Sequence, residues 1–128
     1  MAKKIFDSNI WIAFFAESDP THKQAVKIIN NLTDDEELFI TELIISEIAT
    51  VLKIRYSQDA MRIFLDHVYN SANIRIISLS EYFHQTIDLA KELNDKKLSF
   101  TDMTLLFLSE KYQIETFDKN LKKKIRSK

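Results

Sequence analysis

The chain has 128 residues, of which 45% are hydrophobic and 29% charged, and its formal net charge is −1. These totals predict one soluble, cytoplasmic globular domain over residues 1–128, and they exclude a disordered chain or one that is basic throughout. No apolar run approaches the roughly 18 residues that a membrane-spanning helix needs. The apolar N-terminus is interrupted at Asp7, Ser8 and Asn9, which favours a buried strand over a signal peptide.

Cysteine and glycine are both absent from the sequence. Without cysteine, the chain has no disulfides, no thiolate zinc site and no cysteine nucleophile. Without glycine, it has no Walker-type phosphate loop, no glycine-rich dinucleotide turn and no nucleophile elbow. The turns must instead use asparagine, aspartate and serine.

Apolar patterning predicts strands that alternate with helices along the chain. In the first half we expect strands at residues 3–7 and 38–40, and helices at 8–16, 21–32, 42–56 and 58–71. In the second half we expect strands at 74–79 and 114–117, and helices at 81–94 and 100–112. Thr41 and Ser80 are the predicted N-caps of the helices that follow them. This order predicts an α/β fold in which helices cover both faces of a parallel sheet.

Basic residues are concentrated in a predicted C-terminal tail that begins at about Lys119. Two interpretations remain open, a solvated and frayed terminus or a segment that contacts RNA phosphates. The candidate RNA-binding residues of this tail are Lys122, Lys123, Lys124 and Arg126.

Two aspartates directly follow predicted strands, Asp7 after the first and Asp118 after the last. Ligands of open parallel sheets bind at the carboxyl ends of strands, where the strand order reverses. These two acids are therefore candidates for one shared site. Each also fits the simpler role of a helix N-cap, because helical sequence follows both.

Glu47 falls within the apolar arc of its predicted helix, between Ile54 and Val51 on a wheel of 100° per residue. A carboxylate on a core-facing stripe costs several kcal/mol unless a counter-charge compensates it. The counter-charge is either a salt bridge to Arg55 or a metal ion, and the sequence leaves both open.

Asp102 fits a capping box in which Ser99 is the N-cap of the helix that begins at Phe100. The same carboxylate lies at the start of a strongly apolar helix, where the helix dipole helps to hold an anion. Asp102 is thus a candidate ligand that a structural role would explain equally well.

Four carboxylates that converge on one crevice repel one another, so their convergence implies a bound cation. Oxygen ligands indicate Mg²⁺ or Mn²⁺ rather than zinc. His22, His67 and His84 lie on three different predicted helices without the spacing of metal ligands, so we expect them at the surface or half-buried.

Four segments in order along the chain resemble the acidic motifs of the PIN-domain family, and of its VapC toxins in particular. They are FDSNIWIAFF, SEIATVL, LSFTDMTLLFLSEKY and IETFDKNL. The resemblance implies a three-layer α/β/α sandwich with a short parallel sheet of four or five strands. It also implies that Asp7, Glu47, Asp102 and Asp118 bind Mg²⁺ or Mn²⁺, supported by Asn9, Thr116 and Asn120.

The activity implied by this resemblance is metal-assisted hydrolysis of RNA phosphodiester bonds by the toxin of a type II toxin–antitoxin pair. The implied partners are an RNA substrate, a small antitoxin protein and a second copy of the chain. The alternatives are a housekeeping RNA-processing nuclease, a non-catalytic module that binds RNA or protein, and a phosphate-accepting receiver domain. Trp11, Phe14 and Phe15 are expected in packing, with base stacking as the less favoured role.

Overall fold

Four parallel strands form one sheet in the computed structural model, which describes residues 2–127. The strands are β1 (Ala2–Phe6), β2 (Glu36–Thr41), β3 (Ile74–Ile77) and β4 (Gln113–Glu115). Their order across the sheet is β3-β2-β1-β4, and every neighbouring pair is parallel. The α/β prediction is confirmed, and the described residues contain four strands rather than five.

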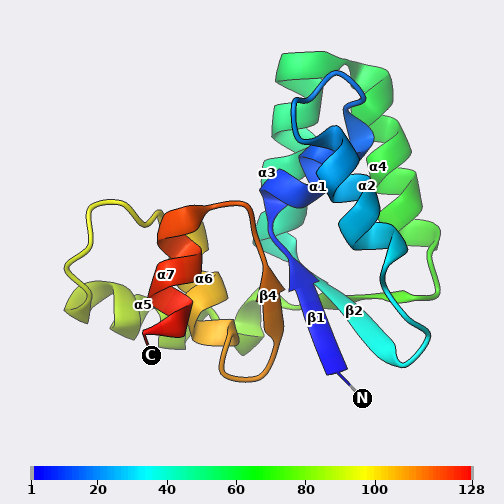
Figure 1. Cartoon of the computed structure of the whole chain (residues 1–128). Helices are drawn as coiled ribbons and strands as arrows, with labels where there is room; N and C mark the ends of the chain where they lie inside the picture. Colours follow the sequence, from blue (N-terminus) through cyan, green and yellow to red (C-terminus); the bar gives the residue numbers. More distant parts are fainter. Residues whose placement is uncertain (1, 128) are drawn as a thin grey trace.

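Helices lie on both sides of this sheet, which completes the predicted three layers (Figure 1). One group comprises α1 (Ser8–Phe15), α2 (His22–Asn30), α3 (Glu42–Val51), a π-helical turn η1 (Leu52–Tyr56) and α4 (Gln58–Asn70). The other comprises a 3₁₀ turn η2 (Leu79–Glu81), α5 (Phe83–Glu92), α6 (Phe100–Leu108) and α7 (Lys119–Arg126). No helix of residues 2–127 is long and apolar enough to cross a membrane.

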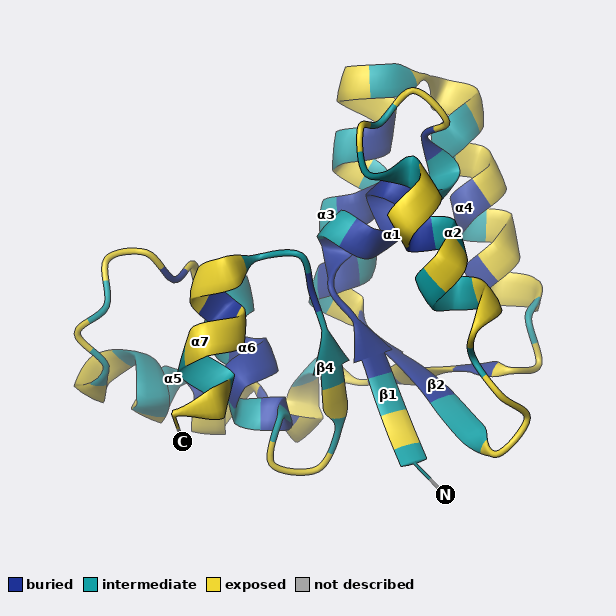
Figure 2. Ribbon diagram, viewed as in Figure 1, coloured by how far each residue is buried: buried dark blue, intermediate teal, exposed yellow. Residues whose placement is uncertain are grey.

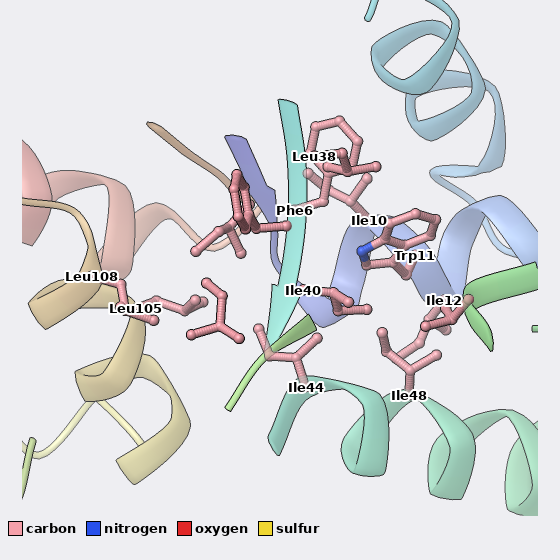
Figure 3. Packing of buried hydrophobic residues seen from close by; sticks show 14 of the residues in the cluster. Phe6, Ile10, Trp11, Ile12, Leu38, Ile40, Ile44, Ile48, Leu105 and Leu108 are labelled. Atoms are coloured by element: carbon pink, nitrogen blue, oxygen red, sulfur yellow. The ribbon is translucent and has the colours of Figure 1, made fainter. Parts of the chain in front are cut away.

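The core is built around the carboxyl half of β1. Ile5 and Phe6 are fully buried, whereas the first residues of the strand are not, so burial deepens toward the end that leads into α1 (Figure 2). Apolar side chains approach from both helical layers, including Trp11 and Ile48 on one side and Leu105 on the other (Figure 3). This packing fixes the strand end that carries the first candidate carboxylate.

The strand order reverses beside β1. The chain moves from β1 outward through β2 to β3, and then crosses back to place β4 on the other side of β1. Asp7 directly follows β1, and Thr116 directly follows β4, two residues before Asp118. The switch point in strand order, where a ligand site is expected, therefore lies between the ends of β1 and β4.

The long helix predicted at residues 42–56 changes geometry at Leu52, where η1 begins. A π-turn holds more residues than an α-turn, so a wheel of 100° per residue no longer places the side chains correctly. Ile54 was predicted inside the apolar arc and is instead 78% exposed. The prediction that Ile54 faces the core was therefore wrong.

The cap predicted at Ser80 and one of the two alternatives for the basic C-terminal segment were wrong for local reasons. Ser80 does not cap the helix predicted at 81–94, because Ser78 begins a 3₁₀ turn and its N–H donates to Glu81 at 3.2 Å. The basic segment after Asp118 is not frayed, because it forms α7 and buries Leu121 completely. The cap predicted at Thr41 is confirmed, since its hydroxyl accepts from the Ile44 N–H at 3.1 Å.

Candidate active site

Asp7 is the most deeply buried of the four candidate carboxylates, with 4% of its surface exposed. It is the N-cap of α1, and its Oδ1 accepts from the Ser8 N–H at 2.7 Å. Its Oδ2 accepts from the Thr116 hydroxyl at 2.7 Å. Both carboxylate oxygens are therefore held at the junction of β1, β4 and α1.

Glu47 reaches the same junction from α3. The Ser8 hydroxyl donates to Glu47 Oε1 at 2.6 Å and lies 3.4 Å from Asp7 Oδ1. Ser8 therefore lies between two acids that are 40 residues apart in the sequence. Glu47 and Arg55 form no ion pair in residues 2–127, so the salt-bridge alternative was wrong. Arg55 lies in the exposed π-turn instead.

Thr116 connects three of the predicted residues through one hydroxyl. While it donates to Asp7, its oxygen accepts from Asn9 Nδ2 at 3.2 Å and from the Asp118 N–H at 3.0 Å. Asn9 Oδ1 in turn accepts from the Phe117 N–H at 3.2 Å. The end of β4 is thereby bound to the start of α1.

Asp102 occupies the predicted capping box at the start of α6. Its Oδ2 accepts from the Ser99 N–H at 3.0 Å, and its own N–H donates to the Ser99 hydroxyl at 3.1 Å. The side chain is half-buried, and its negative charge acts on Asp7. The capping role and a location near Asp7 therefore coexist.

Asp118 is the N-cap of α7 and accepts from the N–H groups of Asn120 and Leu121 through Oδ1, at 2.8 and 3.2 Å. Its charge is not among those that shift the pKa of Asp7. Within residues 2–127, Asp118 is joined to Asp7 through Thr116, whose hydroxyl accepts from the Asp118 N–H and donates to Asp7, and we therefore call Asp118 the rim of the group.

Burial raises the pKa of Asp7 from 3.8 to about 6. Hydrogen bonds from Thr116 and Ser8 oppose this rise, and the negative charges of Asp102 and Glu47 add to it. None of the four carboxylates forms an ion pair with a lysine, arginine or histidine of residues 2–127. The group is thus an uncompensated concentration of negative charge.

The donor set fits a hard divalent cation, because it consists of carboxylate, hydroxyl and amide oxygens. The ligand geometry is not preformed, since no three His, Cys, Asp or Glu side chains of residues 2–127 are grouped closely enough to hold a metal ion. Asp7, Glu47 and Asp102 share one electrostatic environment without forming a closed ligand shell.

Most other side chains singled out by the sequence lie where expected. Trp11 is 1% exposed and packs against Phe64 with ring centroids 6.2 Å apart, so it belongs to the core. His22 is half-buried against the Ala13 carbonyl, while His67 and His84 are exposed.

Ser8 is a candidate site residue that the sequence interpretation missed. It is 6% exposed and contacts both Asp7 and Glu47. The available signal was its position, since a serine directly after a strand-end aspartate lies in the first helical turn beside that acid.

A family model described as PIN domain matches residues 4–126. The chain therefore belongs to the PIN-domain family. One similar structure is VapC20 from Mycobacterium tuberculosis, described as a sarcin–ricin loop cleaving toxin. It has a TM-score of 0.81 and 17% identity, over 93% of this chain and 92% of that one.

A toxin–antitoxin complex from Klebsiella pneumoniae is also similar, with a TM-score of 0.57 and 19% identity over 88% of this chain and 82% of that one. At these identities the likeness establishes the fold. No curated protein sequence matches the chain significantly. The receiver-domain alternative was wrong, because receivers place the first strand between the second and third, whereas β1 here lies between β2 and β4.

Proposed function

We propose that this protein is a Mg²⁺- or Mn²⁺-dependent endoribonuclease, acting in the cytoplasm as the toxin of a type II toxin–antitoxin pair. The observation that carries the proposal is the state of Asp7. Its carboxylate is buried without a cationic partner, and the charges of Glu47 and Asp102 raise its pKa further. Membership of the PIN-domain family supports the nuclease assignment.

The residues that would hold the cation are Asp7, Glu47 and Asp102, with Asp118 at the rim. When bound, a divalent cation stabilises charge at the phosphate and lowers the pKa of water. Binding would also neutralise the repulsion that now raises the pKa of Asp7. The burial of Asp7 makes it the anchor of this set.

The remaining polar side chains position the acids. The Thr116 hydroxyl orients Asp7 Oδ2, and the Ser8 hydroxyl orients Glu47 Oε1. Asn9 keeps the Thr116 oxygen in place by donating to it at 3.2 Å. Asn120, whose backbone N–H donates to Asp118, would assist by orienting the ligands or the scissile phosphate. No histidine is required as a base.

The test is cleavage of end-labelled RNA with and without divalent cation. Asp7→Asn and Asp102→Asn are expected to abolish cleavage while circular dichroism shows a folded chain. Asp66→Asn, on the exposed face of α4, is the matched control and should cut like the wild type. Undiminished cleavage by both site variants, or cleavage that persists in EDTA, would contradict the mechanism.

The toxin role is supported by the similar structures, one described as a toxin and the other as a toxin–antitoxin complex. Expression should arrest growth, and a small protein encoded beside this gene should bind the chain and relieve the arrest. A housekeeping processing enzyme would cut RNA without arresting growth. The homodimer expected from the sequence belongs to the same proposal, and light scattering of the purified chain tests it.

A further inference from the structure

Away from the buried acids, α7 and the connection between α5 and α6 enclose a pocket of about 420 Å³. Figure 1 shows this connection as the loop that arches beside α7. Its lining includes four lysines, Lys96 and Lys97 from the connection and Lys123 and Lys124 from α7. Two segments that are distant in the sequence thus both contribute lysines to the lining of one pocket.

The lining residues of α7 recur with helical spacing. Asn120, Lys123, Lys124 and Ser127 all line the pocket, and positions separated by three and four residues share one face of a helix. The three other basic residues of α7, Lys119, Lys122 and Arg126, do not line it. The basic residues of this helix therefore divide into two faces, only one of which is concave.

Most of the positive charge in the pocket is uncompensated. Asp95 is the one acid in the lining, and it lies 4.0 Å from the Lys124 ammonium group. The ammonium groups of Lys96, Lys97 and Lys123 form no ion pair within residues 2–127. Although the net charge of the chain is −1, the lysines of this pocket create a local region of positive potential, which attracts anions.

The pocket adjoins the candidate active site through α7. Asn120 lines the pocket, and its N–H donates to the strand-end acid Asp118 at 2.8 Å. Lys123 follows Asp118 by five residues, which is roughly 8 Å along a helix axis. A nucleic-acid strand that lies over Asp118 would carry a neighbouring phosphate to these lysines.

We propose that this pocket binds a backbone phosphate of the RNA substrate, next to the phosphate that is cut. This proposal rests on the proposed function, and it adds the path that the RNA strand takes over the protein surface. Ammonium groups bind phosphate as point charges and read no base, so the pocket contributes affinity and register rather than sequence preference. Lys123 and Lys124 act in this contact, whereas Lys122 and Arg126 do not.

The test compares two double variants that each remove two positive charges. Lys97→Ala with Lys123→Ala removes two of the four lysines of the pocket, and Lys23→Ala with Lys27→Ala, two exposed lysines of α2, is the matched control. Binding of a labelled single-stranded RNA is measured by fluorescence anisotropy in EDTA, with Asp7→Asn present so that the RNA stays intact. Circular dichroism checks folding, and Lys97→Gln with Lys123→Gln replaces the pocket variant if the first does not fold.

At about 0.1 M salt, loss of one phosphate contact should weaken binding about fivefold, so the pocket variant should bind roughly fivefold more weakly than its parent. Its slope of log K against log salt should fall by about 0.7, the contribution of one single-strand phosphate contact. The control should stay within about twofold of the parent.

If both double variants weaken RNA binding equally, the proposal that this pocket binds phosphate is overturned, while the nuclease assignment stays intact. Parent protein that binds no RNA would overturn the pocket proposal, and the cleavage test with divalent cation decides the nuclease assignment separately. Titration with inorganic phosphate alone separates a site for the RNA backbone from one for the free ion. Binding of the free ion as tight as binding of RNA, lost in the pocket variant, would contradict the assignment to RNA.

Discussion

The Thr116 hydroxyl donates to Asp7 at 2.7 Å and so ties the end of β4 to the end of β1 across 109 positions of sequence. The same oxygen accepts from Asn9 and from the Asp118 N–H. One hydroxyl group thereby fixes the relative position of two candidate carboxylates, and its removal tests the whole arrangement.

Thr116→Val should lower the free energy of unfolding by about 1–3 kcal/mol, because buried partners of the hydroxyl are left unsatisfied. Cleavage should fall without being abolished. The Thr116 hydrogen bond lowers the pKa of Asp7, so its loss should shift the acidic limb of the cleavage pH profile to higher pH. Urea denaturation and the pH profile measure the two effects. Thr116→Ser should restore both, and a valine variant equal to the serine variant would contradict this role.

The stability of the metal-free protein should fall as pH rises from about 4 to about 6. Burial raises the pKa of Asp7 from 3.8 to about 6, so the folded state binds the Asp7 proton more tightly than the unfolded state. The stabilising protonated form is fully present below pH 4 and is lost as pH passes 6, with an effect of about 3 kcal/mol. Asp7→Asn should flatten this part of the stability profile, and a wild-type profile that rises across the window would contradict the cause given.

Glu47→Gln should keep the acceptor for the Ser8 hydroxyl while it removes one negative charge beside Asp7. The unfolding free energy should change by no more than about 1 kcal/mol in the absence of divalent cation. Thermal shift assays should show that Mn²⁺ raises the melting temperature of the wild type much more than that of this variant. An identical Mn²⁺ response would remove Glu47 from the ligand set.

Ile54 and Ile48 provide a test of the π-turn. Ile54 is 78% exposed and Ile48 is fully buried. Ile54→Ala should therefore change stability by about 0.5 kcal/mol or less, whereas Ile48→Ala should cost about 2–5 kcal/mol. Denaturant titration of the two variants gives the comparison. A large loss from Ile54→Ala would show that the helix continues as α beyond Val51.

The sequence predicts the order of the elements well, because alternation and capping are local properties. Thr41 and Ser99 both cap helices as their spacing implies. The change to π geometry at Leu52 has no such local signature, so the wheel drawn from the sequence misplaced Ile54. Ser78 had the required spacing to Glu81, and only the structure distinguishes it from Ser80.

Parts of the candidate site depend on tertiary contacts that periodicity does not contain. Glu47 was singled out as an acid on an apolar arc, and its partner is Ser8 rather than Arg55. Lys96 and Lys97 were not singled out, since their significance arises only where their loop lies beside α7. Pairings of this kind join positions far apart in the chain, which a one-dimensional pattern does not record.

The absence of glycine matches the backbone that the structure shows. No residue among positions 2–127 has a positive φ angle, so every turn of this part of the chain suits ordinary L-residues. An alanine scan of the turns should accordingly create no backbone strain, since every residue replaced already has a Cβ atom. The unfolded chain is also less flexible than a glycine-containing one of equal length, which reduces the entropy lost on folding. The turns of residues 2–127 therefore impose no requirement for glycine, and substitutions in them should act on stability through side-chain contacts rather than through backbone shape.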